Sequence, residues 1–142
     1  MKRILVAGVS GAIGGALTEA LLERDKESVV VGLCRDPAKV SEPLRSHSRL
    51  TLLAWDAEDS QAPDAVARAL GKTIPAPEGM DTFIYAAGLL HDGAMFPEKR
   101  LEELKAESLS RAFAVNASGF ALLVRALLPV CHCTPAQPII LC

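Results

Sequence analysis

Long uninterrupted apolar runs are missing from this sequence. The first run, Ile4 to Ala7, leads into a glycine-rich segment and is too short for the hydrophobic region of a signal peptide. No run approaches the 18 residues that are typical of a membrane-spanning helix. From these absences we expect no membrane span and no export signal, and therefore a cytoplasmic protein.

A strong excess of charge of one sign is also lacking. Lys and Arg number 15 and Asp and Glu 17, which gives a formal net charge of −2. Such a balance provides no general attraction to nucleic acid or to an anionic membrane, so we expect neither as a partner. Half of the residues are hydrophobic and 23% are charged. We therefore predict one domain with a real core over residues 1–142.

Cysteine is scarce until the end of the chain. Cys34 stands alone, and three more crowd the last dozen residues. Their spacing is not a disulfide framework, and we expect reduced thiols. The segment Cys131-His132-Cys133 invites a metal site, but zinc requires four ligands and only Cys142, His91 and His47 remain as partners. We interpret that segment as a helix end and predict no metal.

Short apolar runs alternate with longer amphipathic stretches along the chain. The runs typical of buried strands are Arg3–Ala7, Ser28–Leu33, Leu50–Ala54, Thr82–Ala86 and the start of a fifth at Pro138–Leu141. Helical patterns cover about 13–24, a short segment after Asp36-Pro37, 60–70 with Gly71 as its stop, and the chain from about Glu98, strongly apolar over 108–130. This alternation predicts an α/β fold, a Rossmann-type doubly wound parallel sheet of order 3-2-1-4-5, in which the chain ends at about the fifth strand.

Three glycines at regular spacing follow the first strand. Residues 7–14 read Ala-Gly-Val-Ser-Gly-Ala-Ile-Gly, and a helical pattern begins there. The first glycine permits a tight turn, the second lets a pyrophosphate approach the backbone, and the third lets the helix pack closely. The alternative is a tight turn without a ligand. Because the amides at a helix start favour a diphosphate, we predict a dinucleotide site. Its predicted members here are Gly8, Ser10, Gly11, Ala12, Ile13 and Gly14.

The end of the second strand indicates which dinucleotide binds. An NAD site places a carboxylate there to accept a hydrogen bond from the ribose 2′-hydroxyl, but Cys34 stands at that point. Arg35 follows, and a guanidinium suits a 2′-phosphate. The sequence therefore favours NADP(H), with NAD(H) possible. In the alternative interpretation Arg35 is a solvated cation and Asp36 contacts the ribose.

The glycine segment resembles the TGxxxGxG motif of the short-chain dehydrogenase/reductase family, with Ala7 in place of the usual threonine. Tyr85-Ala86-Ala87-Gly88 resembles the NNAG motif of the same family with both asparagines replaced, and we expect Tyr85 to be a core residue. The segment from Gly88 to Val115 looks most like C-factor-type reductases within the family. The resemblance covers essentially the whole chain and implies an NAD(P)-dependent carbonyl or alcohol oxidoreductase.

The resemblance also implies roles for three other places. Asp56 accepts a hydrogen bond from the adenine amino group beside the Ala57 amide, although an ordinary helix cap is the alternative. Residues 86–88 let the cofactor ribose lie against the strand end. Asn116 contributes its backbone carbonyl to a proton relay through a water. We expect its side chain to be buried and paired, while a partly exposed helix asparagine is the other interpretation.

The loop after the fourth strand brings a histidine and an acid together. His91 and Asp92 are adjacent, and such a pair can act as a general base. In a loop that follows a strand end we interpret it instead as surface or as lining of a substrate pocket.

The remaining catalytic residues of that family have no counterpart here. Its members use a serine at the end of the fifth strand and Tyr-x-x-x-Lys on the next helix. Tyr85 is the single tyrosine, Leu89 stands four residues later, and Lys105 is the last lysine. We therefore expect a truncated, nucleotide-binding portion that is inactive alone. The alternative is a non-catalytic or regulatory remnant that acts through a partner chain.

Two features predict self-association of such a portion. A sheet that stops at about its fifth strand leaves an open edge that can pair with another chain. The apolar stretch over 108–130 would leave a hydrophobic flank exposed. We therefore expect a homo-oligomer or an association through these two surfaces.

Overall fold

The computed structural model describes residues 1–74, 79–92, 97–130 and 140–141. Its elements in chain order are β1 (Arg3–Ala7), α1 (Ala12–Arg24), β2 (Val29–Cys34), η1 (Pro37–Lys39), α2 (Glu42–Arg45), β3 (Leu50–Ala54), α3 (Ala62–Thr73), β4 (Thr82–Tyr85), η2 (Leu101–Glu103), α4 (Ala106–Phe113), η3 (Ala114–Ser118), α5 (Gly119–Leu127), η4 (Leu128–Val130) and β5 (Ile140–Leu141). The first four strands agree with the predicted runs to within one residue at each end.

The strands form a parallel Rossmann-like sheet. β1 lies between β2 and β4, and β3 pairs with the outer side of β2, which gives the order β3-β2-β1-β4. This part of the predicted order is confirmed. At the β4 edge the two residues Ile140 and Leu141 continue the parallel pairing, opposite Ile84 and Tyr85. Beyond this short pairing, the part of the chain that the structure describes contains no full fifth strand.

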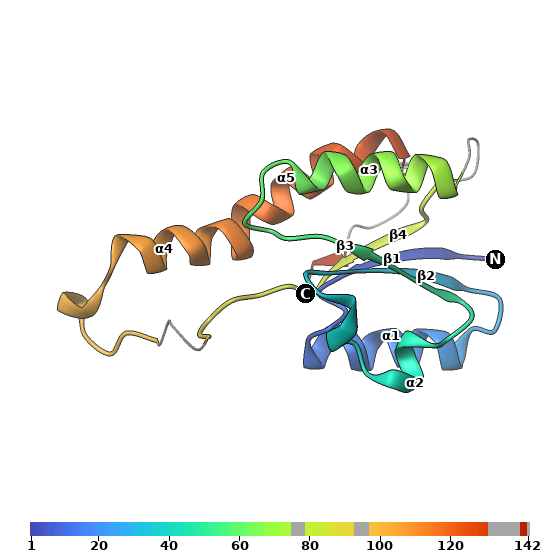
Figure 1. The fold of residues 1–142 in the computed structure, drawn as a ribbon, viewed down its shortest axis with the longest axis horizontal. Helices are drawn as coiled ribbons and strands as arrows, with labels where there is room; N and C mark the ends of the chain where they lie inside the picture. Colours follow the sequence, from blue (N-terminus) through green and yellow to red (C-terminus); the bar gives the residue numbers. More distant parts are fainter. Residues whose placement is uncertain (75–78, 93–96, 131–139, 142) are drawn as a thin grey trace.

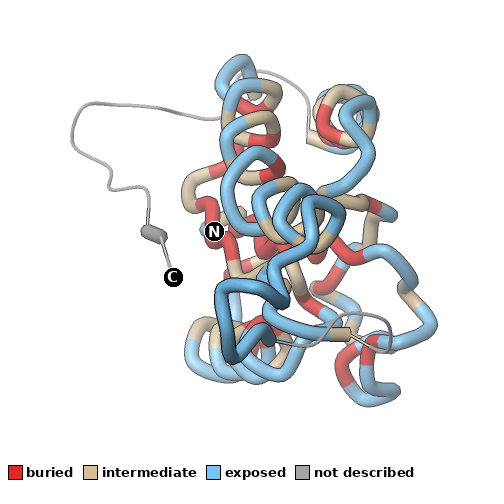
Figure 2. Tube along the Cα trace, turned by 90° about the vertical axis from the view of Figure 1, so that its left-hand side faces the viewer, coloured by how far each residue is buried: buried red, intermediate tan, exposed pale blue. Residues whose placement is uncertain are grey.

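Helices cover both faces of the sheet (Figure 1), and each face has its own apolar layer. Along β1, Leu5 and Ala7 join the cluster under α3 and α5, whereas Ile4 and Val6 join the cluster over α1 and α2. Alternate residues of a strand point to opposite faces, and a parallel sheet is covered on both. Figure 2 accordingly shows the buried segments in the middle of the molecule, with exposed helix surfaces outside them.

Two predicted helix boundaries are wrong. Gly71 does not stop α3, which continues to Thr73. A Cβ at Gly71 would meet nothing within 4 Å, so this position is open to solvent and a glycine there disturbs no packing. The chain after Glu98 forms only the short η2 turn before α4 begins at Ala106. The apolar pattern gave no sign of this later start, because periodicity does not record where the first amides of a helix find partners.

The segments α4, η3 and α5 follow one another as one long helix, and η3 is a π-helical turn (Figure 1). By length and composition the helix Ala106–Val130 is long and apolar enough to cross a membrane. The search for uninterrupted apolar runs in the sequence did not predict this helix. A core helix of a soluble protein passes the same test, so one such helix is weak evidence of a membrane span. Gly119, Leu123 and Leu127 of α5 are buried, whereas α4 has no buried residue.

Candidate functional site

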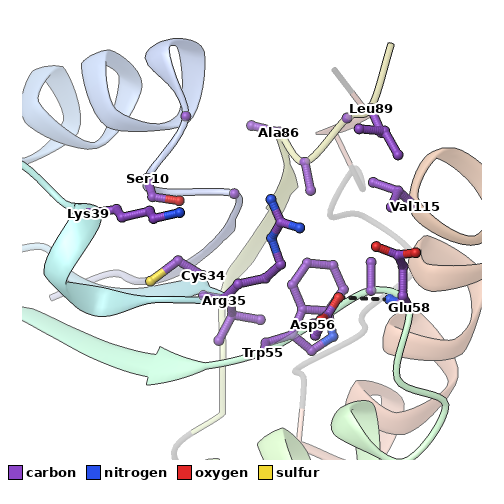
Figure 3. Close-up of a pocket in the computed structure, with 16 residues that line it drawn as sticks. Ser10, Cys34, Arg35, Lys39, Trp55, Asp56, Glu58, Ala86, Leu89 and Val115 are labelled. Carbon is purple, nitrogen blue, oxygen red and sulfur yellow. Dashed lines mark hydrogen bonds between the residues drawn. The ribbon is translucent and has the colours of Figure 1, made fainter. Parts of the chain in front are cut away.

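A pocket opens at the carboxyl ends of β1, β2, β3 and β4, the edge where ligands bind in open α/β sheets. Its volume is about 330 Å³. Among the predicted site residues, those that line it are Gly8, Ser10, Gly11, Arg35, Asp56, Ala57, Ala86, Ala87 and Gly88. The lining residues that sequence reasoning missed are Leu33, Cys34, Lys39, Trp55, Glu58, Leu89 and Val115. Figure 3 shows how these side chains surround the opening.

The glycine turn brings three strand ends together. Gly8 has φ +90, and its amide donates to the Leu33 carbonyl oxygen at 2.8 Å. A Cβ on Gly8 would lie 2.6 Å from the Ala87 nitrogen, and one on Gly14 would lie 2.2 Å from the Gly8 oxygen. No side chain fits at either place, since real Cβ atoms do not approach so closely. The two glycines therefore let β1, β4 and α1 meet around the pocket.

The helix that follows this turn points its positive end at the pocket. α1 begins at Ala12. Its N-cap residue, Gly11, has no side chain to cap the first amides, and the first turn contains no acid. The first amides of a helix lack partners within it and attract anions. Ala12, Ile13 and Gly14, which were predicted as binding residues, lie in this first turn but outside the pocket lining. Any contact from them to a ligand would come from their backbone amides.

Two cations stand at the end of β2. Arg35 and Lys39 both line the pocket, and Figure 3 shows the Arg35 guanidinium projecting into its centre. The Asp36 carboxylate accepts a hydrogen bond from the Ala38 amide at 2.9 Å and so caps η1. Cys34 is buried, and burial, followed by the nearby Asp36 charge, raises the pKa of its thiol. Lys39 was missed, although its place in the short helix after β2 was a usable signal.

The opposite side of the pocket carries two acids. An Asp56 carboxylate oxygen accepts a hydrogen bond from the Glu58 amide at 3.0 Å, drawn as a dashed line in Figure 3. This bond lies within the loop after β3. The alternative of a helix cap is wrong, because the N-cap residue of α3 is Gln61, and the contact of Asp56 with adenine remains a prediction. The neighbouring Trp55 is buried beneath them, and among the described residues its indole nitrogen has no hydrogen-bond partner.

Asn116 fastens the loop after β4 to the long helix. Its carboxamide oxygen accepts from the Leu89 amide at 2.8 Å, and its nitrogen donates to the Leu89 carbonyl oxygen at 2.8 Å. The expected pairing of this side chain is present, but the expected burial is wrong, because Asn116 is exposed. The exposure agrees with the other interpretation, in which Asn116 is a helix asparagine that is not buried. Its part in a proton relay stays a prediction.

Tyr85 is a core residue, as expected. It is buried, and its hydroxyl donates to the Val115 carbonyl oxygen in the π-helical turn. Burial raises the pKa of Tyr85 to about 12. This tyrosine is therefore protonated at neutral pH, and its hydroxyl proton is used in a hydrogen bond to the backbone.

The remaining predicted groups lie elsewhere. Asp92 pairs with Arg111, and neither it nor His91 lines the pocket. Within the described ranges no group of three or more His, Cys, Asp or Glu side chains is arranged to hold a metal ion. The segment Cys131-His132-Cys133 and Cys142 lie outside the described residues.

Comparison with known proteins decides the family. The sequence model of the short chain dehydrogenases matches residues 2–137. This chain belongs to the short-chain dehydrogenase family. A curated relative, a 3-beta-hydroxysteroid dehydrogenase from Mycolicibacterium neoaurum, is 32% identical over 128 residues, which are 89% of this chain and 28% of the relative.

Solved structures of short-chain dehydrogenases have the same fold. An NADPH-bound carbonyl reductase from chicken fatty liver superposes with a TM-score of 0.79 at 22% identity, over 92% of this chain and 48% of that one. A short-chain dehydrogenase from Streptomyces avermitilis gives a TM-score of 0.74 at 26% identity, over 91% of this chain and 44% of that one. This chain thus spans about half the length of these structures, and less of the curated relative.

A short-chain dehydrogenase uses a nicotinamide dinucleotide, NAD(P)H, and the residues present fit such a group. Gly8 and Gly14 let β1, β4 and α1 meet closely beside the pocket, because any side chain there would clash with main chain, and Gly11 lines the pocket without a side chain. The first turn of α1 offers amides, and Arg35 and Lys39 offer positive charge. The shape of the pocket and its positive charge therefore suit an elongated anion.

Proposed function

We propose that this chain binds NADP(H), with Arg35 and Lys39 holding the 2′-phosphate of the adenosine ribose. The observation that carries the proposal is the end of β2, where two cations line the pocket and the strand ends in Cys34 instead of a carboxylate. The next acid in the chain, Asp36, accepts a hydrogen bond from the Ala38 amide and does not line the pocket. A site of this kind favours a phosphate over a ribose hydroxyl.

The remaining contacts follow from the same arrangement. In this proposal the turn of Gly8, Ser10 and Gly11 and the first amides of α1 hold the diphosphate. Asp56 and the Ala57 amide contact the adenine, and the small residues 86–88 accommodate the nicotinamide-side ribose. NADPH supplies a hydride when it is bound.

The whole protein's activity would be that of a carbonyl or alcohol oxidoreductase, and these 142 residues would contribute its nucleotide-binding portion. Their single tyrosine, Tyr85, is buried with its hydroxyl on the Val115 carbonyl and a pKa of about 12. A tyrosine held in this way is a poor proton donor to a substrate. We propose that the chain alone does not turn over a carbonyl substrate, and that Asn116 would serve the relay only in a longer chain or with a partner.

Titration with NADPH and NADH tests the cofactor assignment. We expect NADPH to bind about tenfold to a hundredfold more tightly, since charge-assisted hydrogen bonds contribute roughly 1.5–3 kcal/mol. Arg35→Ala should remove most of this preference and Lys39→Ala part of it, while NADH affinity stays nearly constant. Arg68→Ala, an exposed cation on α3 away from the pocket, is the matched control. Equal affinities for the two dinucleotides in the unaltered chain would refute the assignment.

We also propose that the chain self-associates through α4. No residue of α4 is buried, and Phe113 is 63% exposed beside the partly exposed Leu109. Apolar side chains gathered on one helix surface are typical of contact sites. Size-exclusion chromatography with light scattering should show a species larger than 15.0 kDa; a monodisperse monomer would contradict this proposal.

A further inference from the structure

An arginine on α4 joins the two loops that border the pocket. Arg111 Nε lies 2.9 Å from Glu58 Oε1, and Arg111 Nη2 lies 3.4 Å from Glu58 Oε2. The same Nη2 lies 2.8 Å from Asp92 Oδ2. Glu58 belongs to the loop after β3 that also supplies Asp56, and Asp92 belongs to the chain after β4. One guanidinium thus connects three segments that are distant in sequence.

This cluster differs from an ordinary surface ion pair. The side chains of Arg111, Glu58 and Asp92 are 33%, 29% and 31% exposed. The hydrogen bonds to Glu58, and then those to Asp92, hold the pKa of Arg111 above its ordinary value. A forked, two-acid arrangement of this kind fixes orientation, because the guanidinium is planar and presents its donors in fixed directions.

A second arginine, farther along the same long helix, makes a weaker ion pair. Arg125 lies on α5 and approaches Asp64 only to 3.9 Å, with side chains 64% and 47% exposed. Neither Arg125 nor Asp64 lines the pocket. An interaction of that kind contributes little to stability.

The charge of Glu58 matters because this residue lines the pocket. Glu58 and Asp56 stand two residues apart on the same side of the opening. A dinucleotide is an anion, so an unpaired carboxylate at this rim would repel it over distances of about 10 Å at ordinary salt. The Arg111 guanidinium lies on Glu58 and neutralises that charge locally.

We propose that Arg111 is a positioning residue of the pocket, which fixes the loops after β3 and β4 to α4 and takes up the Glu58 charge without touching the ligand. The part of this inference that concerns the ligand depends on the proposed function. The part that concerns the loops does not, and it is tested without any ligand.

Hydrogen exchange on the ligand-free chain tests the loop connection. In Arg111→Ala we expect amides of residues 57–59 and 88–92 to exchange roughly two- to fivefold faster, the range that a partly exposed ion pair supports. Arg125→Ala should leave the same amides unchanged. Unaltered exchange in Arg111→Ala would overturn the loop connection. If that variant does not fold, Asp92→Asn carries the same test on the loop after β4 alone.

NADPH titration tests the charge. Arg111→Ala should weaken binding roughly three- to tenfold, more strongly at low ionic strength, and Arg111→Lys should weaken it less. Adding Glu58→Gln to Arg111→Ala should recover a large part of the affinity, since the unpaired carboxylate is then gone. A purely structural arginine would show no such recovery, and that result would overturn the charge role. If the unaltered chain bound no NADPH, the proposed function would fail, while the exchange result would still decide the loop connection.

Discussion

Tyr85 shows how its surroundings decide what a single side chain does. Its ring makes edge contacts with the rings of Trp55 at 5.8 Å and Phe120 at 5.3 Å between centroids. Its hydroxyl donates to the Val115 carbonyl. Such aromatic contacts stabilise a core beyond the area they bury. The residue therefore joins the end of β4 to the π-helical turn and is unsuited to acid–base chemistry.

Stability at high pH should depend on Tyr85. Its pKa rises from 10.0 to about 12 on folding, because burial disfavours the phenolate. The neutral form is thus favoured by the fold, so the full contribution is present below pH 10 and is lost as pH rises from 10 towards 12, by up to about 3 kcal/mol.

Urea unfolding of the unaltered chain and of Tyr85→Phe between pH 8 and about 11.5 measures this contribution. The phenylalanine variant should be about 1 kcal/mol less stable at neutral pH, through the lost hydrogen bond, and should lose stability less steeply above pH 10. Parallel pH profiles for the two proteins would contradict the assignment.

At the level of residues, the site was predictable where the backbone alone decides. Gly8 and Gly14 occupy places that no side chain fits, and their spacing is visible in the sequence. Glu58 lines the pocket through the direction of its side chain, which spacing does not encode. Asn116 was expected to be buried from its apolar neighbours, but it is exposed, in a π-helical turn that has no buried residue.

Among the elements, α1 is secured at its end by a side chain from another segment. Arg49, which directly precedes β3, donates to the carbonyl oxygens of Leu22, of Asp25 at 2.7 Å and of Ser28 at 2.8 Å. Cations at a helix C-terminus satisfy its last carbonyls and interact favourably with its dipole. The turn between α1 and β2 is therefore organised by a residue from outside it.

Removal of Arg49 should destabilise the whole chain. Arg49→Ala leaves three carbonyl groups without this donor, and we expect a loss of about 1.5–3 kcal/mol in the free energy of unfolding. Arg45→Ala, which removes an exposed pair with Glu42 and an exposed hydrogen bond to the Ala38 carbonyl oxygen, should cost only about 1 kcal/mol. Chemical denaturation of both variants measures the difference, and equal losses would show that the Arg49 contacts are unimportant.

The strands were predictable and the long helix was only partly so. β1 and β3 match the predicted ranges, because a short apolar run between turn residues has few alternatives in a parallel sheet. The predicted start of α4 and the predicted stop of α3 were wrong, since apolar periodicity does not record which amides a helix start and which carbonyls a helix end have to satisfy. The apolar pattern over 108–130 did not predict the π-helical turn.

For the whole molecule, the contact between α5 and the pocket loops is the critical one. A Cβ on Gly119 would lie 2.7 Å from the Ala114 oxygen and 2.8 Å from the Ala57 Cβ. Ala57 lines the pocket, so the helix that covers one face of the sheet also supports the ligand side of the molecule. Packing on the sheet and the shape of the pocket are thereby coupled.

A pair of glycine substitutions should separate these effects. Gly119→Ala should destabilise the chain by roughly 1–3 kcal/mol through overpacking and should weaken NADPH binding as well. Gly71→Ala, where a Cβ meets nothing within 4 Å, should stabilise α3 by about 0.5–1 kcal/mol and leave binding unchanged. Thermal unfolding with and without NADPH measures both. A Gly119→Ala chain with normal stability and affinity would contradict the coupling.

The π-helical turn over residues 114–118 determines how the side chains of α5 are rotated about the helix axis relative to those of α4. In an uninterrupted α-helix, Leu109, Asn116 and Leu123 would recur every seven residues and share one stripe. One surplus residue in a turn offsets the second half by roughly 100° about the axis. Leu123 can then face the strands while the first half presents its apolar stripe in another direction. A one-residue deletion in this turn would make α4 and α5 one continuous α-helix. The buried positions of α5 and the apolar stripe of α4 could then no longer both keep their present directions.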